Sequence, residues 1–264
     1  MLSRVADSLY WMSRYMERSD GIIRRLKVNY ALSQESVSRN ISNSRSVLQN
    51  MISNKENKNS LINLITKGRE NARSGQDHIS KELWQCLNEF YHSIKDEHLN
   101  DALRKEDPVT ILDALTRYCV VYYGTADMTM IRGEGYFFIN IGKYLERSLQ
   151  VADILSLRFR ENEFEDEAEA KRAIEEVVLN GNFPRSIIYS INRLHRYFER
   201  LRSERNTDGY NKLNFMIGEL HSRVRYSTPE TIIKQGLDQY LSRIKEDLYG
   251  IADALNQHYF AYLL

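Results

Sequence analysis

Apolar residues in the first part of the chain recur at the spacing of one face of an α-helix. They follow one another at steps of three, four or seven: Val5, Leu9, Met12, Met16, Ile23, Leu26 and Tyr30. Consecutive helical residues are about 100° apart, so these side chains fall on a single stripe. The same pattern predicts helices at 3–33, 42–52, 59–66, 70–94, 108–124, 134–160, 165–179, 184–204, 210–224 and 229–262. No hairpin dipeptide separates two alternating apolar runs, so the sequence predicts an all-α fold.

The chain has only three prolines, and each stands where a helix is expected to begin: Pro108, Pro184 and Pro229. A proline ring suits the first helical turn because the missing N–H would have no partner there. Ser227 with Glu230 predicts a capping box at the last of these starts. The polar stretch 205–209 predicts a loop before the helix at 210.

One short phrase occurs twice, as RYMERS at residues 14–19 and as KYLERS at residues 143–148. Similarity in kind extends from Met12 and Ile141 to Leu26 and Leu155. The repeat predicts a multi-helix bundle built from two pseudo-repeated halves, about 1–130 and 131–264, within a single domain, 1–264.

The second copy places a charged pair, Glu146 and Arg147, on a helix that is apolar nearly all the way round. Such a helix is usually buried, and buried charges need partners because an isolated ion in low dielectric is costly. Repeat symmetry therefore suggests that Glu17 faces Arg147 and that Glu146 faces Arg18. This hypothesis assumes that the two helices touch.

A second feature also occurs twice, because Arg73-Ser74 and Arg185-Ser186 each precede a predicted helical run. We expect both arginines at helix beginnings, where each would reach a shared anion or a buried carboxylate. Hydrogen bonding and packing at the helix start is the open alternative for these arginines.

Charge and apolar patterning exclude several classes of protein. The 37 basic side chains nearly balance 36 acidic ones, and the net charge of +1 gives no footprint for nucleic acid or an anionic membrane surface. No segment approaches the ~18 apolar residues of a membrane span, and the start of the chain does not resemble a signal peptide. We therefore expect a cytoplasmic protein in which Cys86 and Cys119 are buried free thiols.

Metal and cofactor sites are not expected. The acidic run at 161–169 lacks the spacing of a calcium loop and is typical of a solvated helix start. Glu89 and His92 form one Glu-x-x-His, whereas a di-metal carboxylate bundle needs two. No Gly-rich phosphate loop and no Ser/His/Asp or Cys/His arrangement is present. If the protein is an enzyme, Glu17 and Glu146 are the candidate acid and base.

Several segments resemble the bacterial alpha-E domain family, which is named for its helices and its Glu-Arg motif. They are residues 1–18, 69–74, 142–147 and 184–186. At Ser19-Asp20-Gly21 the chain departs from the family, whose members often have Ala-Glu-Asn there. The resemblance implies an all-helical domain found in gene clusters with a circularly permuted ATP-grasp-type ligase and a transglutaminase-like protein.

That resemblance implies a role in making or trimming peptide or amide bonds. The leading hypothesis is a helical partner or specificity subunit that binds an anionic peptide or the ligase. Arginine suits this role because its planar fork pairs bidentately with a carboxylate. The candidate contacts are Arg18, Arg73, Arg147 and Arg185. The competing hypothesis is an enzyme that uses Glu17 and Glu146 in peptide or amide chemistry.

Overall fold

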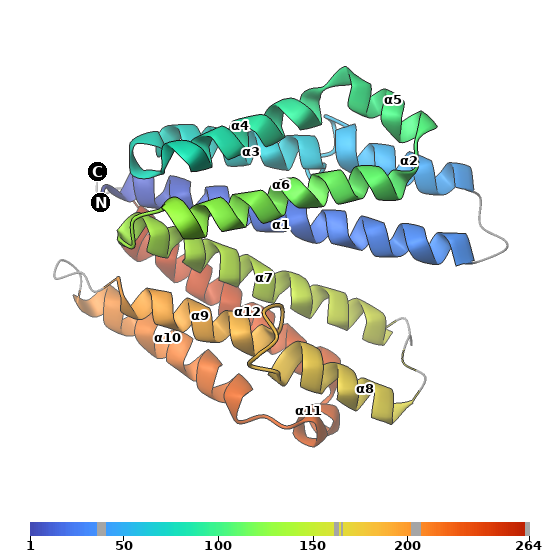
Figure 1. The fold of residues 1–264 in the computed structure, drawn as a ribbon. Coiled ribbons are helices and arrows are strands. Elements are labelled where there is room, and N and C mark those ends of the chain that lie inside the picture. Colours follow the sequence, from blue (N-terminus) through green and yellow to red (C-terminus); the bar gives the residue numbers. More distant parts are fainter. Residues whose placement is uncertain (36–40, 161–163, 165, 202–206, 262–264) are drawn as a thin grey trace. The chain divides into compact units, whose positions relative to one another are not determined.

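The computed structural model describes residues 1–35, 41–160, 164, 166–201 and 207–261, and over these residues the chain is α-helical without a strand (Figure 1). The predicted all-α fold class is confirmed. The chain divides into two compact units, a first unit of Trp11–Tyr136 and a second unit of Met1–Tyr10 with Phe137–Leu264. The predicted boundary of the pseudo-repeat near residue 130 stays a prediction, because compactness and duplication are separate properties.

The first unit contains most of the long first helix, from Trp11 onward, and the helices that follow it up to residue 129. In chain order the helices are α1 (Ser3–Glu35), α2 (Ile41–Ser53), α3 (Leu61–Ser74), α4 (Lys81–Lys95), α5 (Glu97–Lys105) and α6 (Pro108–Thr129). α3 packs along α4, and α4 packs along α6 (Figure 1). Their facing sides are apolar, with Leu83, Leu87 and Phe90 of α4 fully buried. This apolar seam fixes α6, which carries the tyrosines described below.

The second unit contains the first turns of α1 and the remaining helices. In chain order these are α7 (Glu134–Arg160), α8 (Glu167–Ala173), α9 (Ile187–Glu199), α10 (Thr207–Arg225), α11 (Pro229–Gln235) and α12 (Leu237–Leu255), with π-helical segments at Ile174–Leu179 and Asn256–Phe260. α9 packs on α10, and α10 packs on α12. α7 crosses α1 closely, because a Cβ built on Gly142 would lie 2.4 Å from the carbonyl oxygen of Tyr10.

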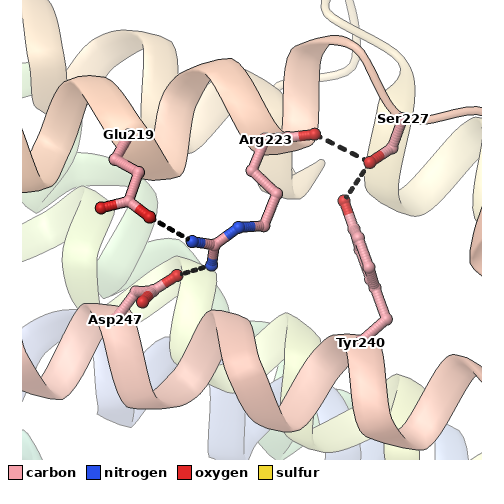
Figure 2. A network of polar contacts seen from close by, with 5 residues as sticks. All are labelled: Glu219, Arg223, Ser227, Tyr240 and Asp247. Atoms are coloured by element: carbon pink, nitrogen blue, oxygen red, sulfur yellow. Dashed lines mark hydrogen bonds and ion pairs between the residues drawn. The ribbon is translucent and has the colours of Figure 1, made fainter. Parts of the chain in front are cut away.

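A polar network fastens α10 to α12 in the second unit (Figure 2). Arg223 of α10 donates to Glu219 one turn earlier at 2.8 Å and to Asp247 of α12. Tyr240 of α12 donates to the hydroxyl of Ser227 at 3.0 Å, and Ser227 donates to the carbonyl of Arg223. The network links two helices that also bury apolar side chains, among them Leu220 and Val224 of α10 and Ile244 and Leu248 of α12.

Helix starts follow the expected capping chemistry. Pro108 and Pro229 are the first residues of α6 and α11. Ser186 accepts from the backbone N–H of Tyr189 and caps α9, so Pro184 lies just before the helix. The predicted capping box is displaced by one residue, because it forms between Thr228 and Thr231 and not between Ser227 and Glu230. Thr228 directly precedes Pro229, the first residue of the helix, so its side chain is the one placed to accept from the free N–H groups of the first turn.

Several of the predicted helix boundaries are wrong, and α3 and α6 extend to Ser74 and Thr129, beyond the predicted ends at 66 and 124. The helix predicted at 70–94 is interrupted, because α3 ends at Gly75 and α4 begins only after the cap at Ser80. The helix predicted at 229–262 breaks at Gly236, whose φ of +94° is compatible with glycine but strained for other residues. α10 begins at Thr207, inside the loop predicted at 205–209, whose first two residues lie outside the described part. The helix α5 was not predicted.

The acidic run is a helix start where it is described. Asp166 accepts from the backbone N–H of Glu169 at 2.7 Å and caps α8. Glu161, Glu163 and Glu165 lie outside the described residues. Within the described part of the chain, no helix has the length and apolar character needed to cross a bilayer.

Candidate functional site

The two Glu-Arg pairs lie on long helices, Glu17-Arg18 on α1 in the first unit and Glu146-Arg147 on α7 in the second unit. Glu17 is 1% exposed, Glu146 is 3% exposed and Arg147 is 7% exposed, whereas Arg18 is half-buried. The apolar residues around the second copy predicted a buried helix, and Glu146 and Arg147 are indeed buried. The proposed pairing of Glu17 with Arg147 and of Glu146 with Arg18 stays a prediction.

The two copies share one hydrogen bond at equivalent positions. Ser19 donates to the carbonyl of Tyr15 at 2.9 Å, and Ser148 donates to the carbonyl of Tyr144 at 2.9 Å. Both serines are fully buried. A serine that bonds the carbonyl four residues earlier satisfies its own hydroxyl within the helix. The repeated phrase therefore has the same local structure in both places.

In the first unit, Glu17 lies against α6. The hydroxyl of Tyr123 donates to Oε2 of Glu17 at 2.5 Å. Such a short bond to a buried carboxylate is typical of a charge-assisted interaction. Asp20, one turn further along α1 and also fully buried, forms an ion pair with Arg24 at 3.0 Å. This part of the first unit thus holds two buried carboxylates, Glu17 and Asp20, and the hydroxyl of Tyr123.

The two cysteine thiols of the first unit, Cys86 and Cys119, are not suited to nucleophilic chemistry. Burial raises the pKa of Cys119 well above its usual value, and the charges of Asp20 and Glu17 raise it further. Burial, with a contribution from Glu89, raises the pKa of Cys86 to about 11. A thiol, unlike a thiolate, is a poor nucleophile. Both cysteines are buried and free, as predicted.

In the second unit, Arg147 reaches the beginning of α9. Its Nη1 donates to the carbonyl oxygen of Pro184 at 3.1 Å. The next residue along the chain is Arg185, which is half-buried. The structure therefore brings two of the four predicted contacts, Arg147 and Arg185, to one place. Ser186, whose side chain caps α9, fixes the backbone on which Arg185 is held.

Aromatic rings lie close to Arg147. Tyr144, 7% exposed, is stacked on Tyr197 with ring centroids 6.1 Å apart and is tilted against Tyr189 at 6.2 Å. Arg147 lies 5.4 Å and Lys143 lies 4.6 Å from the Tyr144 centroid. Burial raises the pKa of Tyr144, and Arg147 opposes that rise. Cations placed over tyrosine faces are attracted by the negative face of the ring, which holds them in position.

Arg193 completes the group. Its Nη2 donates to the hydroxyl of Tyr189 at 3.0 Å, and its Cζ lies 5.0 Å from the ring of that tyrosine. We call Lys143, Arg147, Arg185, Arg193, Tyr144, Tyr189 and Tyr197 the arginine–tyrosine cluster. Sequence reasoning identified only Arg147 and Arg185 in it. The spacing of Arg185, Tyr189 and Arg193 at steps of four was the available signal for two others.

Arg73 does not have the position predicted for it. It lies in the last turn of α3 and is exposed, so it does not open a helix as Arg185 does. The misplacement follows from the wrong prediction of one helix over 70–94. Arg18 and Arg73 belong to the first unit, whereas Arg147 and Arg185 belong to the second.

Glu89 and His92 are both exposed on α4, where they line an open groove. Within the described ranges, no three histidine, cysteine or acidic side chains converge in a way that would hold a metal ion. Ser19 and Asp20, at the departure from the family pattern, are fully buried and therefore belong to the core.

Comparison with protein families gives one match. The family model is Alpha-E, described as a predicted alpha-helical domain with a conserved ER motif, and it matches residues 1–172 and 161–260. The match in two segments is consistent with two pseudo-repeated halves. Neither curated proteins nor solved structures give a match to this chain. Because the family model covers nearly the whole chain, including both Glu-Arg pairs, the protein belongs to the Alpha-E family.

Proposed function

We propose that this protein is a helical binding component of a peptide- or amide-bond-forming system, and that it holds an anionic peptide through the arginine–tyrosine cluster. The observation that carries the proposal is the position of Arg147, which is buried, stacked near Tyr144 and bonded to the backbone beside Arg185. A guanidinium fixed in this way loses little conformational freedom when it binds a carboxylate.

The chemistry of the cluster favours binding over catalysis. Its ionisable members are cations and phenols, and burial raises the pKa of Tyr144, which keeps that hydroxyl protonated at neutral pH. Arginine is permanently charged and does not transfer protons at neutral pH. A carboxylate is the ligand group that best matches several guanidinium forks and phenol hydroxyls. An ATP-grasp-type ligase and a transglutaminase-like protein are the partners that we propose, because the family resemblance implies them.

Calorimetric titration with triglutamate tests the proposal. We expect wild-type protein to bind triglutamate and not triglutamine amide, which has the same length without carboxylates. Arg147→Lys keeps the charge but removes the fork, and should weaken binding about 10- to 100-fold, the usual value of hydrogen bonds to a charged group. Arg117→Lys on the exposed face of α6 is the matched control and should leave binding unchanged. Equal binding by both variants would remove the support for this site.

The partner proposal has a separate test. Co-purification of the protein with an ATP-grasp-type ligase of the kind that the family resemblance implies should succeed with wild-type protein and with Arg117→Lys. A protein that binds neither the ligase nor triglutamate would contradict the binding function as a whole.

A second function, acid–base catalysis by Glu17 and Glu146, is favoured by one observation. Tyr123 donates to Glu17 at 2.5 Å in a buried setting, and such a pair is able to share and transfer a proton. The expected result under this alternative is turnover of peptide or amide substrates by the isolated protein, with loss of turnover in Glu17→Gln. Absence of turnover in the wild-type protein, with and without the ligase, would exclude it.

A further inference from the structure

The outward face of α9 carries a row of cations. Four apolar residues of α9 point inward and are fully buried: Ile187, Ile191, Leu194 and Phe198. On the opposite side, residues recur at steps of four, three and four, which places them within about 60° of one another on the helix. These residues are Tyr189, Arg193, Arg196 and Arg200, and we call them the α9 ridge. Arg196 and Arg200 are exposed, and Arg193 is half-buried.

The ridge is not neutralised by acids of its own helix. Within α9 the one acidic residue is Glu199, which lies to the side of the ridge and is 3.9 Å from His195. Arg200 is the C-cap residue and keeps a helical backbone conformation, so it continues the row. Arg193 is held against Tyr189 by a hydrogen bond and by its ring. At one end the ridge reaches Arg185, beside which Arg147 is bonded to Pro184.

The length of the ridge selects an extended ligand. With a rise of about 1.5 Å per residue, Tyr189 to Arg200 spans about 16 Å, and Arg193 to Arg200 spans about 10 Å. In an extended peptide, side chains on one face are separated by about 7 Å. An extended acidic segment of about five or six residues therefore presents successive carboxylates at spacings that the three arginines of the ridge are able to meet.

We propose that the α9 ridge is the docking surface for an extended acidic segment of the peptide ligand. The inference rests on the proposed function and deepens it. A first carboxylate occupies the arginine–tyrosine cluster at Arg147 and Arg185. The following glutamate or aspartate side chains lie along Arg193, Arg196 and Arg200. The ligand class is thus an oligo-acidic peptide, and a single carboxylate engages only one end of the surface.

An acidic peptide fits the ridge better than a nucleic acid does. The ridge is one helix wide, and the chain as a whole has a net charge of +1. Proteins that bind nucleic acid usually spread basic residues over a broad surface and track many phosphates. Glu199 on the flank of the ridge also limits how wide a polyanion can be.

Fluorescence anisotropy with labelled hexaglutamate and labelled triglutamate tests the inference. The ridge variant is Arg196→Glu/Arg200→Glu, in which both positions are exposed. The control variant is Lys234→Glu/Arg243→Glu, which changes the net charge equally at exposed positions of α11 and α12. We expect the ridge variant to weaken hexaglutamate binding about tenfold or more, because each exposed ion pair usually contributes a few-fold and reversal adds repulsion. It should change triglutamate binding less than about threefold, and the control variant should change neither by more than that.

The outcomes separate the ridge from the proposed function. If hexaglutamate binding depends on Arg147 but not on the ridge, the proposed function stands and the ridge inference is wrong. If ridge and control variants weaken binding equally, overall charge and not the ridge is responsible, which also overturns it. Tighter binding of a single-stranded oligonucleotide than of hexaglutamate would overturn the choice of a peptide. Absence of binding to either peptide by wild-type protein contradicts the proposed function itself.

Circular dichroism of each variant checks that the fold is retained. Arg196→Gln/Arg200→Gln is a milder second variant, which removes the two charges without reversing them.

Discussion

The two copies of the repeated phrase have the same helix-internal structure and different surroundings. In both, a buried serine bonds the carbonyl of the tyrosine four residues earlier. In the first unit, Tyr123 of α6 donates to the acid of the pair, Glu17. In the second unit, the base of the pair, Arg147, donates to the backbone beside Arg185.

This difference shows that the same short sequence can lie in two different chemical environments. The first unit surrounds its copy with a second carboxylate, Asp20, and with phenols and a thiol of α6. The second unit surrounds its copy with cations and tyrosines from α7 and α9. The local helix is set by the repeat, whereas the charge of the environment is set by the helices packed against it. Proton chemistry suits the first setting, and anion binding suits the second.

The largest expected effect is loss of either buried acid. If each acid is paired with an arginine as the repeat predicts, Glu17→Ala and Glu146→Ala should each lower the free energy of unfolding by about 3–5 kcal/mol, because the arginine is left without its counter-charge. Urea denaturation measures the effect, and Glu89→Ala at an exposed position of α4 should change stability by less than about 0.5 kcal/mol. Combining Glu17→Ala with Arg147→Ala tests the pairing predicted from the repeat. Simple additivity of the two single effects would count against that pairing.

Loss of the phenol that donates to Glu17 should have the next largest effect. Tyr123→Phe removes the donor to a buried carboxylate and should cost about 1.5–3 kcal/mol, the usual contribution of a hydrogen bond to a charged group. Tyr118→Phe, one turn and a half earlier on α6 and half-buried, is the matched control. If both variants unfold at the same urea concentration, the hydrogen bond from Tyr123 to Glu17 does not contribute to stability, and this difference between the two copies has no energetic consequence.

A smaller effect is expected at the position just before each copy. This position is Ser13 before the first copy and Gly142 before the second, and a Cβ on Gly142 would lie 2.4 Å from the carbonyl oxygen of Tyr10. Gly142→Ala should therefore destabilise by about 1–2 kcal/mol, since the cost of overpacking exceeds the better helix propensity of alanine. Gly68→Ala on α3, where the new Cβ meets only ordinary contacts at 3.6 Å or more, should stabilise by up to about 1 kcal/mol. Equal effects in thermal melts would show that the close approach at Gly142 is not limiting.

The parts of the structure that depend on local chemistry were predictable from sequence. Helical periodicity gave the fold class, and the prolines at 108 and 229 marked true helix starts. The break between α3 and α4 was predictable in principle, because Gly75 and the mostly polar residues that follow it up to the cap at Ser80 are typical of a turn. Missing this break moved Arg73 from a helix end to a predicted helix beginning.

The arginine–tyrosine cluster was only partly predictable, for a different reason. Its members come from α7 and α9, so which of them meet depends on the packing of two helices and not on the spacing within either. Arg147 and Arg185 were identified because they occur in repeated phrases. Tyr144 and Tyr197 become neighbours only when α7 lies on α9. The α9 ridge lies on one helix, and its spacing is visible in the sequence once the start of α9 at Ile187 is known.

The smallest effect that we expect distinguishes the two units by their response to acid. His221 of α10 stacks on His195 of α9 with centroids 5.3 Å apart, and its Nε2 lies 2.7 Å from Oδ1 of Asn192. Burial lowers the pKa of His221, the charges of His195 and Arg225 lower it further, and Glu199 opposes them. In the first unit, His78, His92 and His98 are all exposed.

A histidine whose folded pKa lies below its usual value near about 6.5 takes up a proton more readily when unfolded, so stability is lost as pH falls through that value. Hydrogen exchange at pH 7.5 and pH 5.5, corrected for intrinsic rates, should show amides of α9 and α10 losing protection at the lower pH. Amides of α4 should change less. His221→Gln, which keeps a polar partner for Asn192 without a titrating group, should reduce the loss in α9 and α10, whereas His92→Gln should not. If His221→Gln leaves the pH response of α9 and α10 unchanged, His221 is not its source. His195, which stacks on His221, is then the next residue to replace in the same experiment.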